Sequence, residues 1–88
     1  MGLDAVETIL WAEKEFEIDI SDSDAANIVT VGQFSIYIHN KLLMKQGFKA
    51  LSEKIVFERV KTFLVTQFDI KPEWITREVE FAADLGMS

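Results

Sequence analysis

Residues 30–44 read TVGQFSIYIHNKLLM, and this stretch decides the fold because it combines a helix start signal with a helical apolar repeat. Thr30 and Gln33 have the spacing of a capping box, in which each side chain accepts a hydrogen bond from the other residue's backbone. The apolar residues then recur at helical intervals, at Val31, Phe34, Ile38 and Leu42. We therefore predict a helix from Thr30 to Met44, ended by Gly47.

Two further stretches predict long helices, one on each side of this segment. Residues 3–16 form an amphipathic repeat, with apolar residues near one face of a helix. Ser52 can cap a second helix that runs to about Phe68, because its hydroxyl can accept from a backbone N–H of the first turn.

The remaining segments are shorter or irregular. We expect a loop at residues 18–20, a short helical turn from Ser21 or Asp22 through Asn27, a connector at residues 45–51, and an irregular stretch over residues 74–88. The sequence therefore predicts a single all-α domain over residues 1–88. Its expected architecture is a small helical bundle with three main helices and one or two short ones.

Composition narrows the class of protein. The chain has 88 residues, no cysteine and a single histidine, His39, so it offers no Cys-based metal site and no His-rich one. Its net charge is −6, which disfavours nucleic-acid binding because that binding depends on Lys and Arg at the phosphates. No apolar run approaches the roughly 20 residues of a membrane span, and no secretory signal is visible. We expect a cytoplasmic protein.

Several segments resemble parts of the acyl carrier protein family, the phosphopantetheine-binding domains, but in permuted order. The family's signature, Asp-Leu-Gly-x-Asp-Ser-Leu-Asp, is divided between the two ends of this chain. Its front resembles Asp84-Leu85-Gly86-Met87-Ser88, and its back resembles Leu3-Asp4-Ala5-Val6-Glu7. Residues 1–44 resemble helices 2 to 4 of the family, residues 45–51 form the connector, and residues 52–88 resemble helix 1 and the long first loop.

The resemblance implies a non-enzymatic carrier. Family members hold an acyl chain on a 4'-phosphopantetheine arm, attached to a serine at the start of the second helix, for fatty acid or polyketide-type synthesis. By residue type, Ser88 matches this serine, but the aspartate before it is missing. By spacing, Gly2 takes the serine's place, so the Asp-Ser-Leu motif is broken in either alignment.

The resemblance also implies which residues recognise partners and hold the acyl chain. The partners would be the basic surfaces of acyl-transfer or synthase enzymes and a phosphopantetheinyl transferase. The recognition acids would be Asp4, Glu7, Glu13 and Glu17. The acyl pocket would be lined by Val6, Leu10, Ala12, Phe16, Ile20 and Ile28. Apart from the resemblance, acids on a helix more often form a solvated face, and apolar residues at helical spacing more often form an ordinary core.

Three origins are consistent with the order of the segments. The chain is a circular permutant, natural or engineered, or a segment of a tandem array, or one partner of a dimer that exchanges halves. We favour the permutant, with a monomer or a domain-swapped dimer as the assembly. The alternative function, from a different class, is a non-carrying helical scaffold or protein-interaction module.

Overall fold

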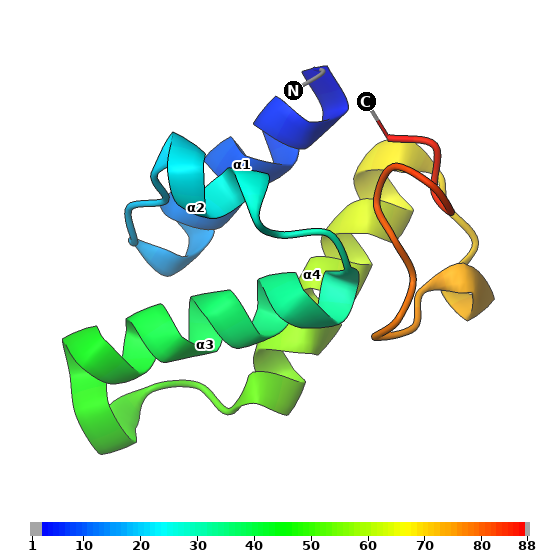
Figure 1. The fold of residues 1–88 in the computed structure, drawn as a ribbon. Coiled ribbons are helices and arrows are strands. Elements are labelled where there is room, and N and C mark those ends of the chain that lie inside the picture. Colours follow the sequence, from blue (N-terminus) through cyan, green and yellow to red (C-terminus); the bar gives the residue numbers. More distant parts are fainter. Residues whose placement is uncertain (1–2, 88) are drawn as a thin grey trace.

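The computed structural model describes residues 3–87 and confirms the expected all-α bundle (Figure 1). Three long helices alternate with shorter elements along the chain. In order, they are α1 (Leu3–Phe16), α2 (Asp22–Ala26), α3 (Val31–Gln46), the 3-10 turn η1 (Gly47–Lys49), α4 (Glu53–Phe68) and the 3-10 turn η2 (Pro72–Trp74). Within the described residues no helix is long and apolar enough to cross a membrane.

The capping residues of the helices are those that the sequence predicts. Thr30 caps α3 through a capping box in which Gln33 N–H donates to Thr30 Oγ1 over 3.1 Å and Gln33 Oε1 accepts from Thr30 N–H. Ser21 and Ser52 cap α2 and α4 in the same way with their hydroxyl oxygens. Gly47 ends α3 with a φ of 61°, a backbone conformation that favours glycine.

The connector is more regular than the sequence predicts. Helix α3 continues through Lys45 and Gln46, two residues beyond the expected end at Met44, and the chain then forms η1 before it reaches Ser52. The imidazole of His39 helps to fix this corner, because its Nδ1 lies 2.9 Å from the carbonyl oxygen of Leu51. The corner turns the chain so that α4 packs along α3.

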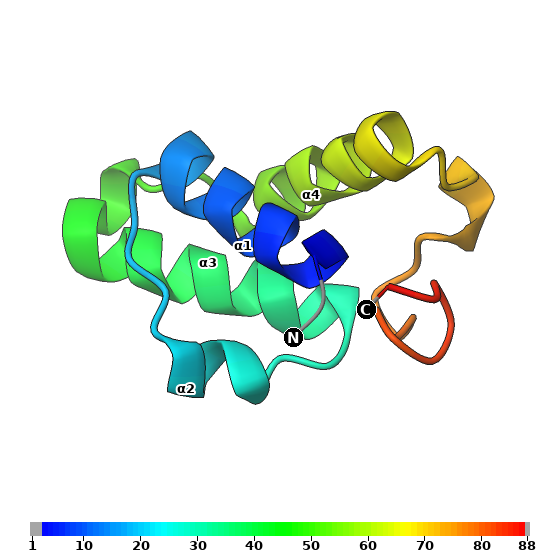
Figure 2. The same cartoon turned by 90° about the horizontal axis from the view of Figure 1, so that it is seen from above.

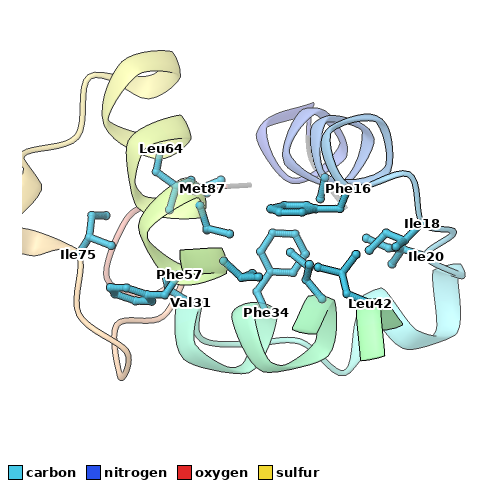
Figure 3. Packing of buried hydrophobic residues seen from close by; sticks show 14 of the residues in the cluster. Phe16, Ile18, Ile20, Val31, Phe34, Leu42, Phe57, Leu64, Ile75 and Met87 are labelled. Carbon is cyan, nitrogen blue, oxygen red and sulfur yellow. The ribbon is translucent and has the colours of Figure 1, made fainter. Parts of the chain in front are cut away.

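Helix α3 is the centre of the bundle and packs against both α1 and α4 (Figure 2). Phe34, in the first half of α3, is almost fully buried and points toward Phe16 of α1 (Figure 3). Ile18 and Ile20 lie in the loop after α1 and are also buried, so the loop is held to the core by alternate residues. The remaining members of the core are Ala12, Val31, Ile38, Leu42, Val56, Phe57, Val60, Leu64, Ile70, Ile75 and Met87.

Trp11 lies off the apolar stripe of α1, and the structure explains this position. Its indole stacks on Phe63 of α4, with ring centroids 4.3 Å apart and planes inclined by 12°. The same indole meets Phe16 edge to face at 5.6 Å. Trp11 therefore joins α1 to α4.

Candidate functional site

The C-terminal segment, residues 75–87, is attached to the beginning of α3. Val31 N–H donates to the carbonyl of Val79 over 3.0 Å, and Gly32 N–H donates to the carbonyl of Arg77 over 2.8 Å. These donors belong to the first turn of α3, where the helix itself supplies no acceptor. Phe81 N–H in turn donates to the carbonyl of Val29 over 3.1 Å. The segment thus supplies acceptors for the free N–H groups at the start of α3, and the same hydrogen bonds hold the segment in place.

Beyond Phe81 the chain folds back in a tight turn, over residues that the sequence analysis compared with the front of the carrier-protein signature. The Asp84 carboxylate accepts from Glu80 N–H over 2.7 Å, and Gly86 has a φ of 66°. Met87 N–H donates to the carbonyl of Phe81 over 2.9 Å, and its side chain is buried in the core (Figure 3). The turn therefore directs the end of the segment inward, toward α1.

An apolar cavity of about 310 Å³ lies where these elements meet. Its walls come from the first half of α1, from α2 and the residues after it, and from the C-terminal segment, with Phe34 of α3 completing the lining. The lining residues are Ala5, Thr8, Ile9, Ala25, Ile28, Val29, Phe34, Phe81, Ala82 and Met87. Ala5 of α1 and Met87 of the C-terminal segment both line this cavity, so residues from opposite ends of the chain lie close together in space.

The chemistry of the cavity favours an apolar ligand. Among the described residues that line it, Thr8 alone has a polar side chain, and its hydroxyl already donates to the carbonyl of Asp4 over 2.8 Å. Apolar cavities of about 150 Å³ can take up benzene, so the volume here has room for roughly a dozen carbon atoms. A site of this kind can hold an alkyl chain but offers no free side-chain group for a polar one.

The residues that the resemblance assigned to the acyl pocket lie in three different environments. Ile28 lines the cavity. Ala12, Phe16 and Ile20 are buried in the core. Val6 and Leu10 are exposed, at 38% and 58% of their full surface.

Most of the cavity lining was not assigned from the sequence. Ile9 and Phe81 carried a usable signal, because both fit an apolar pattern, and Ala5 and Met87 lie in the segments that resemble the carrier-protein signature. Thr8 and Ala82 gave no such signal, because small residues on a helix or turn become a wall only when another segment packs opposite them.

The four predicted recognition acids also differ in their surroundings. Glu7 is exposed and accepts a hydrogen bond from Gln67 of α4 over 3.3 Å, while Asp4 is half-buried in the first turn of α1. Glu13 has a local role, because its carboxylate accepts from Ile20 N–H over 2.9 Å and fixes the loop after α1. Glu17 is exposed at the end of that helix with a φ of 53°.

The predicted attachment residue, Ser88, and the alternative position by spacing, Gly2, lie outside the described residues. Within residues 3–87, no group of three or more His, Asp or Glu side chains is placed to hold a metal ion. Burial first, and then the hydrogen bond from its hydroxyl to Asp24 over 2.7 Å, raises the pKa of Tyr37 to about 12. The hydrogen bond to Glu53 likewise raises the pKa of the Arg77 guanidinium.

No protein-family model matches the chain, and no solved structure matches it.

Proposed function

We propose that the chain is an acyl-carrier-like domain with its halves in circularly permuted order. The observation that carries the proposal is that Met87 and Ala5, from opposite ends of the chain, line one apolar cavity. Read from α4, the elements follow the family's order of long helix, long loop, long helix, short helix, long helix. The order of the elements along the chain, read from α4, is thus the order that the resemblance implies, and this supports the proposal.

The physical setting suits a carrier with an apolar cargo. The cavity lies beside the first half of α1, whose N-terminal end favours a negatively charged group such as a phosphodiester. Asp4 and Glu7 in the same part of α1 provide the negative charge that basic enzyme surfaces would recognise. In this proposal the protein works in the cytoplasm, carries 4'-phosphopantetheine on Ser88 and serves fatty acid or polyketide-type synthesis.

The test is phosphopantetheinylation. The full chain is incubated with coenzyme A and a broad-specificity phosphopantetheinyl transferase, with an acyl carrier protein of ordinary order modified in parallel, and its intact mass is recorded. We expect a gain of one phosphopantetheine group that maps to Ser88 and disappears in Ser88→Ala. A gain that persists in that variant would place the attachment elsewhere. No gain, with the parallel protein modified, would refute carrier chemistry.

That last outcome would favour the second candidate, a non-carrying scaffold or interaction module. The sequence supplies the specific reason to keep it, because Gly2 takes the serine's place when the signature is aligned by spacing. The two candidates share the same fold, so only the chemistry at the divided signature separates them.

A further inference from the structure

The corner formed by the end of α3 and η1 carries two large apolar side chains that are almost fully exposed. Phe48 is 95% exposed and Met44 is 85% exposed, and Leu43 beside them is 44% exposed. Isolated exposed apolar residues are common on protein surfaces, but large neighbouring ones often mark an interaction site. Figure 1 shows this corner projecting at one end of the molecule, away from the chain termini. We refer to residues 43–49 as the α3 corner.

The charge around the corner is opposite to that of the rest of the protein. The chain has 15 acids and 9 bases, yet no acid occurs from Ala25 to Ser52, where the charged residues are Lys41, Lys45 and Lys49. Two acids on other elements lie near this stretch. Glu17, after α1, accepts a hydrogen bond from Lys45 at its backbone carbonyl, and Glu53 is the first residue of α4. The exposed apolar pair therefore has Lys45 and Lys49 beside it in the corner. Lys49 is exposed, Lys45 donates to the Glu17 carbonyl, and Lys41, one turn earlier on α3, is half-buried over the ring of Tyr37.

We propose that the α3 corner binds an anionic lipid surface. Phe48 and Met44 would enter the boundary between headgroups and acyl chains, while the lysines would remain at the level of the anionic headgroups. Large apolar side chains next to Lys are the combination by which peripheral proteins bind such surfaces. A projecting corner also reaches a flat bilayer without the rest of the fold changing shape.

The net charge of −6 does not prevent this contact at physiological ionic strength. Charges are screened over about 8 Å in such a solution, and the molecule is 34 Å long. Acids near the far end of the bundle, such as Asp4 and Asp84, are thus electrostatically remote from a membrane that touches the corner. With only three lysines nearby, the binding should be weak, reversible and sensitive to salt.

The test is sedimentation of the full chain with vesicles made of equal parts of phosphatidylcholine and phosphatidylserine, compared with vesicles of phosphatidylcholine alone. We expect partition onto the anionic vesicles only, and release as the salt concentration is raised. Phe48→Ser should lower the partition coefficient about tenfold, equivalent to roughly 1.4 kcal/mol. Lys49→Gln should lower it about fivefold, in line with one lysine at the headgroups.

The matched control is Trp74→Ser, which removes another exposed aromatic that lies beside a lysine, Lys71, on a different surface. This control should bind as the unmodified chain does. The proposal is overturned if the unmodified chain does not bind anionic vesicles, if it binds both kinds of vesicle equally, or if Phe48→Ser and Trp74→Ser have the same effect. If the chain does not bind vesicles, an acidic protein surface becomes the partner to test instead. The test uses neither Ser88 nor the cavity, so its result is independent of the proposed carrier function.

Discussion

Gly32→Ala is the substitution that most directly tests how the C-terminal segment is held. Gly32 is buried in the first turn of α3, and a Cβ added there would lie 2.7 Å from the carbonyl oxygen of Arg77 and 3.1 Å from its Cβ. Ordinary contacts begin at about 3.4 Å, so the backbone of the segment would have to move by several tenths of an ångström. The same carbonyl accepts the Gly32 N–H, so the movement also weakens that hydrogen bond.

Two opposing terms set the expected magnitude. Overpacking of this kind costs roughly 1–3 kcal/mol, whereas alanine is favoured over glycine within a helix by about 1 kcal/mol. Because the clash is with backbone rather than with the end of a flexible side chain, the steric term should lie in the upper part of its range, at about 2–3 kcal/mol. After the gain of about 1 kcal/mol from alanine, we expect the free energy of unfolding to fall by about 1–2 kcal/mol, which lowers the melting temperature by about 5–15 °C for a domain of this size.

The assay is thermal and urea unfolding followed by circular dichroism. Amide hydrogen exchange adds local information, and Phe81 and Met87 should lose more protection than the middle of α4. The matched control is Asn40→Ala, an exposed position on α3 where the gain in helix propensity acts without a clash. If Gly32→Ala is as stable as the unmodified chain while Asn40→Ala behaves as expected, the close approach of the segment to α3 is wrong.

Three further predictions concern the caps, the aromatic contacts and the tyrosine. Thr30→Ala should cost about 1 kcal/mol, seen as a lower urea midpoint with an unchanged slope, because the capping box is lost; no shift would contradict this. Trp11→Ala and Phe63→Ala should show a coupling of about 0.5–1.5 kcal/mol in a double-mutant cycle, whereas additive effects would exclude an energetic role for stacking. The absorbance of Tyr37, the only tyrosine, should titrate with a pKa of about 12 in the folded chain and near the ordinary 10 in urea. Because the unfolded chain loses the phenolic proton at a lower pH, the free energy of unfolding should fall as the pH rises from about 10 to about 12. Asp24→Asn should lower the folded-state pKa of Tyr37. A folded-state pKa near 10 would refute the hydrogen bond.

Local signals predicted the helices well because they act within a few residues. Thr30 and Ser52 can be identified as caps from their own side chains and the helical repeat that follows, and both cap the helices that the sequence predicts. Gly47 ends α3 for an equally local reason. The one extension, through Lys45 and Gln46, occurs because nothing in those residues opposes another half-turn of helix.

The cavity could not be predicted in the same way because it depends on contacts between distant segments. The first N–H groups of α3 need acceptors, but the sequence does not say that Arg77 and Val79 provide them. Once that attachment is made, Phe81 and Met87 become walls opposite α1. The stacking of Trp11 on Phe63 could not be predicted from periodicity either, because the two residues lie on different helices and are 52 positions apart in the chain.

In the proposed permuted order, the division of the signature has different consequences for the fold and for the chemistry. Each side of the division is anchored on its own: Met87 through the segment attached to α3, and α1 through Ala12 and Phe16 in the core. The entropic cost of bringing two chain segments together grows only slowly with the number of residues between them. A covalent link between Met87 and α1 would therefore add little to the stability of the bundle. Carrier chemistry has a stricter requirement than the fold, because a transferase must bind a serine held at the start of α1. A chain of this kind can therefore keep the helices and the apolar cavity whether or not it is modified, which is why the mass measurement, and not the fold, decides between carrier and scaffold.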